Sequence, residues 1–153
     1  MNSGTRAALS GGTTTIVDLV IPDKDQSLMD AVNAWKEDVE ESGTNMICNF
    51  ALSNNFEIEL TKKNFFSSAC CDVALTVAIP RWDESVKDDV TQLVKEEGIN
   101  SFKVYMAFKN ELMLTNEELL DVFDHCKSLG AIVHVHAENG TIIAENEKRL
   151  RAK

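Results

Sequence analysis

One lysine interrupts an otherwise mostly apolar run at residues 100–109, and it is the first candidate for chemistry in this sequence. Such a run is typical of a buried strand, on which alternate residues such as Ser101, Lys103 and Tyr105 share one face. Burying an ammonium group is unfavourable unless the group is paired, neutralised or bound to a metal. Lys103 is therefore either a side chain that reaches solvent at a sheet edge or a functional group inside an enzyme core.

Two histidines lie on a second apolar run, at residues 131–140. His134 and His136 are two residues apart, so on a strand both imidazoles point to the same face. Imidazole is the commonest metal ligand in proteins. His136 stands at the end of the expected strand, whereas His134 lies about 6.6 Å deeper at 3.3 Å per residue. His136 is thus the better candidate ligand and His134 the better core histidine, the plain alternative being two core histidines with ordinary hydrogen bonds.

The elements that must position these residues alternate between strand and helix. Runs rich in β-branched residues predict strands, and apolar residues at helical spacing predict helices. We expect, in order, a helix ending at Ser10, a strand over 13–21, a helix begun by Ser27, a strand over 72–79, a helix ending near Gly98, the lysine strand, a helix opened by Thr115, the histidine strand and a last helix over 141–153. Four such repeats predict an α/β fold of about four parallel βα units with right-handed crossovers.

The helix opened by Thr115 begins with a capping box, Thr115-Asn116-Glu117-Glu118. His125 on this helix is predicted to be a solvated or boundary residue. The predicted core face of the helix consists of Leu119, Val122, Phe123 and Cys126.

An asparagine-rich segment at 43–69 has apolar residues with no sustained period. Connections in βα units usually run about 2–6 residues, so this segment is much longer than expected. We predict a poorly ordered insertion without a function of its own. Two origins are compatible with it, a tolerated surface insertion or a translated intron, and the transcript across residues 43–69 distinguishes them.

Composition excludes several classes of partner. The net charge is −10 and the isoelectric point is near 4.7, which argues against nucleic acid and against an anionic membrane surface. No apolar run is long enough to span a bilayer, and the first residues have no apolar signal core. The four cysteines form no Cys-x-x-Cys motif, so we expect reduced thiols and a cytoplasmic protein.

Several motifs together resemble a known family. Residues 100–109 (NSFKVYMAFK) and 135–140 (VHAENG) are similar to the dihydropyrimidinase and hydantoinase family of cyclic-amide hydrolases, and to their non-enzymatic relatives, the collapsin response mediator proteins. Residues 4–14, Trp35-Lys36 and Cys70-Cys71-Asp72 add support. The resemblance covers almost the whole chain outside 43–69. It implies a contiguous part of a (β/α)8 TIM barrel, which needs about 250 residues when complete.

The resemblance also implies a site. At the position of Lys103 the family carries a lysine carboxylated to a carbamate, which bridges two zinc ions, and at the position of His136 it carries a metal-binding histidine. Catalytic members have a tyrosine oxyanion donor where this chain has Phe108, so that donor is lost. Tyr105 shares the lysine face and is a candidate substrate-binding residue. The implied substrate is a small cyclic amide, and the implied assembly is a homotetramer.

Three functions compete on these observations. Lys103 with His136 favours part of a zinc-dependent cyclic amidohydrolase, whereas Phe108 favours a non-catalytic scaffold or signalling protein of the mediator type. A generic α/β domain without a site is the third. The family's upstream His-x-His strand, its later histidine and its aspartate are missing from these residues, so we expect the chain alone to be inactive.

Overall fold

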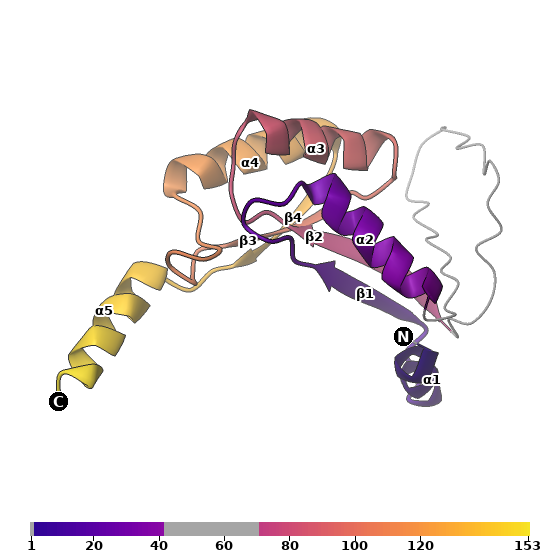
Figure 1. Ribbon diagram of the computed structural model, residues 1–153, viewed down its shortest axis with the longest axis horizontal. Coiled ribbons are helices and arrows are strands. Elements are labelled where there is room, and N and C mark those ends of the chain that lie inside the picture. Colours follow the sequence, from indigo (N-terminus) through magenta and orange to yellow (C-terminus); the bar gives the residue numbers. More distant parts are fainter. Residues whose placement is uncertain (1, 42–70) are drawn as a thin grey trace. The chain divides into compact units, whose positions relative to one another are not determined.

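The structure is a computed structural model that describes residues 2–41 and 71–153. The segment predicted to be an insertion, 43–69, lies outside the described residues. Those residues form, in order, α1 (Asn2–Ser10), β1 (Thr15–Val20), α2 (Leu28–Glu41), β2 (Asp72–Ala78), α3 (Glu84–Lys95), β3 (Ser101–Tyr105), α4 (Asn116–Leu129), β4 (Ile132–His136) and α5 (Gly140–Arg151) (Figure 1). The expected order of helices and strands is confirmed, and none of the described helices is both long and apolar enough to cross a membrane.

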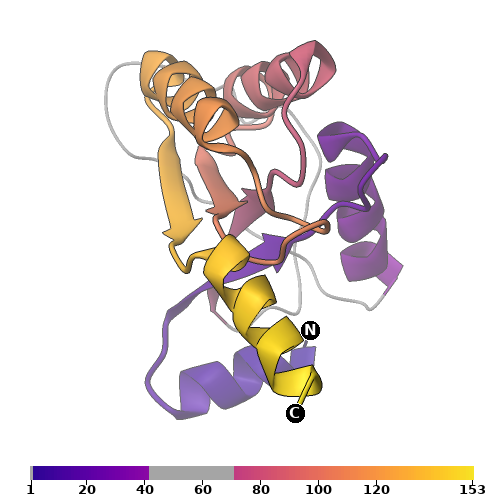
Figure 2. The same ribbon diagram turned by 90° about the vertical axis from the view of Figure 1, so that its left-hand side faces the viewer.

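The strands form a four-stranded sheet in the order β1-β2-β3-β4. β2 pairs in parallel with β3, and β3 pairs in parallel with β4. Sequential neighbours in a parallel sheet place successive crossover helices on one face, as in a barrel, whereas doubly wound sheets reverse their order. Figures 1 and 2 show α3 and α4 on the same side of the sheet.

Residues 1–18 and 33–75 make up one compact unit, and residues 19–32 and 76–153 make up a second. In the first unit, Gly11-Gly12 ends α1, and Gly12 has a φ of 85° that suits glycine. Within the same unit the indole N–H of Trp35 donates to the carboxylate of Asp18 at 3.0 Å. The second unit holds all four candidate functional residues.

The core of the second unit lies on the helix side of β2 and β3. Val77, Phe102 and Val104 are fully buried, together with the inward faces of α3 and α4. On α4 the predicted core residues Leu119, Val122 and Cys126 are buried. The prediction for Phe123 is wrong, because this residue is 37% exposed; it lies at the edge of the buried face, about 40° around the helix from Leu119.

Local signals explain where these helices begin and end. The carboxylate of Asp83 accepts the backbone N–H of Val86 and caps α3. The capping box at Thr115 is present at the start of α4, and Gly130 ends this helix with a φ of 70°. Burial raises the pKa of the Cys126 thiol to about 11, so this side chain remains a protonated thiol at neutral pH.

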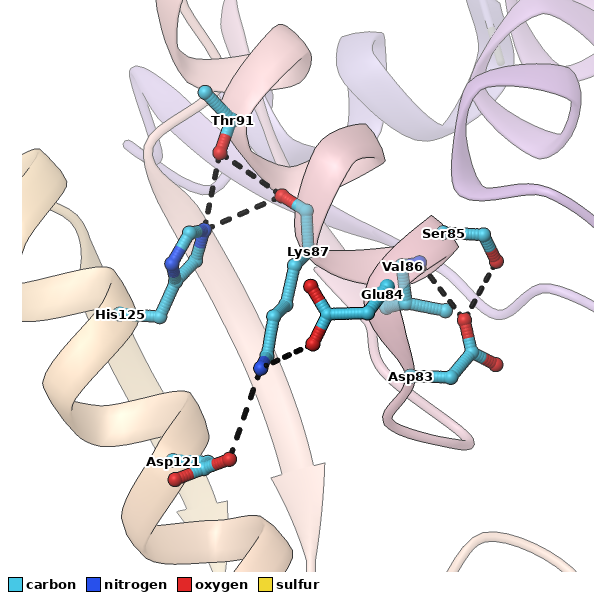
Figure 3. Close-up of polar contacts among 8 residues, drawn as sticks. All are labelled: Asp83, Glu84, Ser85, Val86, Lys87, Thr91, Asp121 and His125. Carbon is cyan, nitrogen blue, oxygen red and sulfur yellow. Dashed lines mark hydrogen bonds and ion pairs between the residues drawn. The ribbon is translucent and has the colours of Figure 1, made fainter.

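A polar cluster ties α3 to α4 (Figure 3). The hydroxyl of Thr91 donates to the carbonyl oxygen of Lys87 at 2.9 Å. The Nε2 atom of His125 lies 3.0 Å from the Thr91 hydroxyl and 3.2 Å from the same carbonyl oxygen, so Nε2–H is the donor to both. The ring of Trp82 packs edge-on against His125. His125 is therefore a boundary residue with hydrogen-bond partners, which is one of the two predicted alternatives.

Candidate active-site face

Lys103 lies in the interior of the sheet. Its strand, β3, stands between β2 and β4, so the interpretation of a lysine at a sheet edge is wrong. In the strand register Lys103 has Ala78 on one side and His134 on the other. The side chain is half-buried, and its Nζ atom lies 5.7 Å from the centre of the Tyr105 ring.

A hydrogen-bonded chain crosses three strands beside this lysine. The hydroxyls of Thr76 and Ser101 are 2.7 Å apart and both residues are buried. The Ser101 hydroxyl also lies 3.1 Å from Nε2 of His134. This contact shows that the lysine face of β3 and the histidine face of β4 are the same face of the sheet, because alternate residues share a side.

His134 departs from its expected setting. It was the better candidate for a core histidine, yet its side chain is exposed. The reason is that β4 is the last strand in the sheet order, so its side chains have a neighbouring strand on one side only. The ring still has a hydrogen-bond partner in Ser101.

His136 stands at the carboxyl end of β4, in register with Tyr105. Its Nε2 atom is 2.7 Å from a carboxylate oxygen of Glu138, and the imidazole side chain is 38% exposed. The ring centroid lies 5.9 Å from that of Tyr105. Lys103 and His136 thus occupy one face of adjacent strands, His136 nearer the carboxyl end, which is the catalytic end of such barrels.

Phe108 lies in the loop after β3, at the carboxyl end of this face. Its ring packs edge-on against Tyr105 with a centroid separation of 5.6 Å and lies 5.4 Å from the ring of His136. The backbone of Phe108 has a φ of 57°, a region that is unfavourable for a bulky side chain and is often occupied at functional sites. Burial raises the pKa of the Tyr105 hydroxyl, which therefore stays protonated at neutral pH.

The loop after β4 is held tightly against the loop after β3. The N–H of Gly140 donates to the carbonyl oxygen of Met106 at 2.8 Å. A Cβ atom at position 140 would lie 2.8 Å from the sulfur of Met113 and 3.0 Å from that carbonyl oxygen, so this close approach requires glycine. Beside the two loops lies a cavity of about 390 Å³ lined by Met106, Met113, Leu114, Thr115, Asn116, Glu117, Leu119, Asn139, Thr141 and Ile142.

Among the described residues, no three His, Cys, Asp or Glu side chains come together as a metal site. Lys103 and His136 nevertheless have donor types that suit a divalent metal once the lysine carries a carboxylate, and they share a face. The chemistry of these two residues fits part of the metal centre that the resemblance implies, and their roles as ligands stay predictions.

A sequence profile of the amidohydrolase family matches residues 1–153 of this chain. The chain belongs to the amidohydrolase family. Among curated relatives, this amidohydrolase chain is 42% identical to the dihydropyrimidinase of Dictyostelium discoideum over 147 residues, which are 96% of the chain and 24% of that relative. It is 39% identical to dihydropyrimidinase-related protein 5 of Homo sapiens over 145 residues, 95% of the chain and 21% of that relative.

Solved structures agree with this assignment. The amidohydrolase chain superposes on a D-hydantoinase from a Bacillus species with a TM-score of 0.75 and 31% identity, covering 98% of the chain and 27% of that protein. The dihydropyrimidinase from Brevibacillus agri gives a TM-score of 0.74 at 32% identity, with 98% and 27% coverage. The chain thus spans about a quarter of the length of these relatives, and its α/β fold is part of a (β/α)8 TIM barrel.

The sequence predicted that Ser101 shares the face of Lys103 but gave it no role, and it did not point to two further polar residues, Thr76 and Glu138. A signal for Glu138 was present, because a carboxylate two residues after a candidate ligand can reach its ring. Nothing in the sequence marked Thr76, whose partnership with Ser101 depends on the register of β2 against β3.

Proposed function

We propose that this chain is a section of a cyclic-amide hydrolase and carries one bridging lysine and one histidine of its metal centre. The proposal rests on the placement of Lys103 and His136 on one face of two adjacent strands. Lys103 belongs to the internal strand β3, and His136 belongs to the terminal strand β4. Relatives named dihydropyrimidinase and D-hydantoinase support a small cyclic amide, such as a dihydropyrimidine or a hydantoin, as the substrate. Their names and the shared family make hydrolysis of a ring C–N bond the proposed reaction.

Carboxylation replaces the positive charge of the partly buried Lys103 side chain with a group that can bind metal. The neutral amine attacks carbon dioxide, a nitrogen–carbon bond forms, and one proton leaves to solvent. The product is an anion with two oxygens in place of a cation, and such a carbamate suits a position between two metal ions. We assign Lys103 as this bridging N6-carboxylysine and His136 as a neighbouring ligand.

Zinc, two ions per complete subunit, is the proposed cofactor. When bound, it supplies Lewis-acid activation of a water molecule and of the amide carbonyl group. The imidazole of His136 is a ligand of the kind that zinc prefers, and it is partly exposed at the carboxyl end of its strand. Buried Tyr105 lines the same face and is the proposed substrate-contacting residue.

Phe108 weakens the catalytic assignment. A phenylalanine donates no hydrogen bond, and loss of one oxyanion donor typically lowers the rate by about 10²–10³-fold. The Tyr105 hydroxyl does not take the place of this donor, because Tyr105 belongs to the strand and Phe108 to the loop beyond it. Residual activity of the complete protein therefore depends on Lys103 and His136 with their metals.

A non-catalytic scaffold or signalling protein is the second candidate, and Phe108 is the observation that favours it. The likeness to dihydropyrimidinase-related protein 5 is consistent with this alternative. Metal analysis of a full-length version distinguishes the two functions. Two zinc ions per chain together with hydrolysis of dihydrouracil support the hydrolase, whereas a protein without bound metal supports the scaffold.

The remaining proposals concern setting and assembly. We infer a cytoplasmic location, because the four cysteines form no Cys-x-x-Cys motif and reduced thiols are typical of that compartment. A homotetramer is the proposed assembly of the complete protein. Cys71 and Cys126, the cysteines within the described residues, are both free thiols, which is consistent with a reducing compartment.

A further inference from the structure

Asn139-Gly140 is the one Asn-Gly pair in the sequence. Each of the two residues has its own structural reason to be there. The side-chain oxygen of Asn139 accepts the N–H of Ile142 at 3.0 Å and so caps α5. Gly140 is buried, and a Cβ atom at this position would lie 2.8 Å from the sulfur of Met113. The fold thus places an amide side chain next to an unhindered backbone nitrogen, and these are the two groups that react when asparagine deamidates.

We propose that Asn139 is a site of spontaneous deamidation, and that the contact between the loops after β3 and β4 controls its rate. In this reaction the backbone nitrogen of Gly140 attacks Cγ of Asn139, a nitrogen–carbon bond forms, and ammonia leaves with the proton of the Gly140 N–H. The product is a cyclic succinimide. Water opens the ring at either carbonyl group and gives aspartate or isoaspartate, so that one water is consumed for each ammonia released.

The closed loop engages both reacting groups in other contacts. The N–H of Gly140 donates to the carbonyl oxygen of Met106 at 2.8 Å, so this nitrogen keeps its proton. The side-chain oxygen of Asn139 is held by the N–H of Ile142. Both hydrogen bonds must open before the nitrogen of Gly140 can attack. Asn139 itself is exposed, so water reaches the succinimide once it forms.

Opening at this point is local. Gly140 is the buried residue of α5, whereas Ile142 is 58% exposed and Leu150 is 67% exposed. Separation of the start of α5 from the loop after β3 therefore exposes little apolar surface, and segments with few buried apolar contacts open without global unfolding. Met113, whose sulfur lies over Gly140, opposes this opening.

The two products have different effects on the loop. Aspartate caps helices as well as asparagine does, so it preserves the start of α5. Isoaspartate instead adds a methylene group to the main chain, which displaces the N–H of Gly140 from the carbonyl oxygen of Met106. Isoaspartate at position 139 therefore releases the loop that follows His136 from the loop that carries Phe108.

Asn100-Ser101 offers an internal comparison, because serine is also a small residue. The carbonyl oxygen of Asn100 accepts the N–H of Ile132 at 2.8 Å, and Ser101 is buried. Ser101 begins β3, which is an internal strand, so this pair becomes reactive only when the sheet itself opens. Modification of Asn139 without modification of Asn100 is therefore the signature of local opening.

The test incubates the 153-residue chain near neutral pH, folded and in urea, and follows both asparagines by peptide mapping with mass spectrometry. A protein isoaspartyl methyltransferase with a labelled methyl donor detects isoaspartate separately. We expect isoaspartate at position 139 in both samples, forming about 10-fold more slowly in the folded chain, and no change at Asn100 in the folded chain. Met113→Ala should raise the folded rate severalfold and leave the rate in urea unchanged.

Met29→Ala is the matched control, because it removes the same side chain from α2, outside both loops. It should leave both rates unchanged. Asn139→Ser retains a side chain that caps helices and should abolish the isoaspartate signal, which assigns that signal to this residue. A backbone amide spectrum recorded before incubation checks that each variant is folded.

An unmodified Asn139 in the folded chain, over the time that completes the reaction in urea, overturns the site. Equal rates in the folded and urea samples, or an unchanged folded rate in Met113→Ala, overturn control by the loop contact. Modification of Asn100 at the same rate as Asn139 in the folded chain means that the whole sheet opens, which also overturns that control.

Discussion

Lys103 is held on an internal strand by neighbours that do not neutralise it. Ala78 and His134 flank it in the register, and Tyr105 lies 5.7 Å from its Nζ. None of these three side chains carries a negative charge at neutral pH. The proposed conversion to a metal-bound carbamate would give this side chain a function at its interior position.

Phe108→Tyr tests whether the missing donor limits the chemistry. Phe108 is 47% exposed, so a hydroxyl group at the ring edge should be accommodated without a clash. In the full-length protein we expect the rate of dihydrouracil hydrolysis to rise by about 10²–10³-fold, because one oxyanion donor is restored. Steady-state kinetics with kcat and KM resolved separately are the measurement.

Phe123→Tyr is the control for this substitution, since Phe123 lies partly exposed on α4, away from the candidate site. It should leave kcat unchanged. An unchanged kcat for Phe108→Tyr in a protein shown to bind zinc would mean that position 108 contributes no oxyanion donor, and would favour the scaffold function.

At the scale of elements, short-range contacts between α3 and α4 organise the helical layer. The ammonium of Lys87 pairs with Glu84 on its own helix at 2.8 Å and with Asp121 on α4 at 3.8 Å (Figure 3). The hydrogen bond to Glu84 raises the pKa of Lys87. His125 reaches from α4 to the backbone of α3. Several weak links thus fix the relative position of two helices that cover the lysine strand.

Asp83→Ala should destabilise the fold by about 1 kcal/mol, because α3 loses its N-cap. The hydrogen bonds from Ser85 and from the Val86 N–H hold the pKa of Asp83 below its usual value. A carboxyl group with a lowered folded pKa stabilises the fold above its unfolded pKa, and this contribution disappears as the pH falls through the folded value. Urea unfolding at about pH 7 and about pH 3 measures both effects.

Asp83→Asn separates the cap from the charge. Asparagine caps helices nearly as well as aspartate but does not titrate. We expect Asp83→Asn to keep most of the stability near neutral pH and to lose less of it on acidification than the unaltered chain. Equal acid sensitivity of the two proteins would show that Asp83 contributes nothing to the pH dependence.

At the scale of the whole molecule, the sheet has β1 and β4 as its terminal strands. Side chains that a closed barrel would cover are exposed on each of them, including Val17 on β1 and Ile132, 55% exposed, on β4. Unpaired edges of this kind favour association with other strands. The relatives are about four times longer than the chain, so a complete barrel offers these strands partners that the chain by itself does not.

The 153-residue chain should therefore show no hydrolysis of dihydrouracil above a metal blank. The proposed ligands Lys103 and His136 are too few to hold two metals tightly, and the described residues contain no group of three or more His, Cys, Asp or Glu side chains that could hold a metal ion. An assay at high protein concentration with added zinc and bicarbonate is the measurement. Turnover that Lys103→Ala abolishes would contradict this expectation.

Particular residues show how much of the structure could be predicted from the sequence. Local patterns predicted the helices and strands of the described residues, since caps such as Thr115 and Gly130 act within a few residues of themselves. The shared face of Ser101, Lys103 and Tyr105 followed from alternation alone. Phe123 and His134 were misplaced because their exposure depends on which neighbours reach them.

The sequence by itself determined the element order and the family resemblance, and it supplied two candidate metal ligands that stay predictions, because periodicity and motif spacing are local properties of the chain. The tertiary structure decided that Lys103 is interior, that the lysine and histidine faces coincide, and that Glu138 meets His136 at 2.7 Å. The register between strands arises from contacts between residues far apart in the sequence, and no local pattern encodes it. The contact of Glu138 with His136 joins residues two positions apart, and it depends on the course of the loop after β4, which packs against the loop after β3.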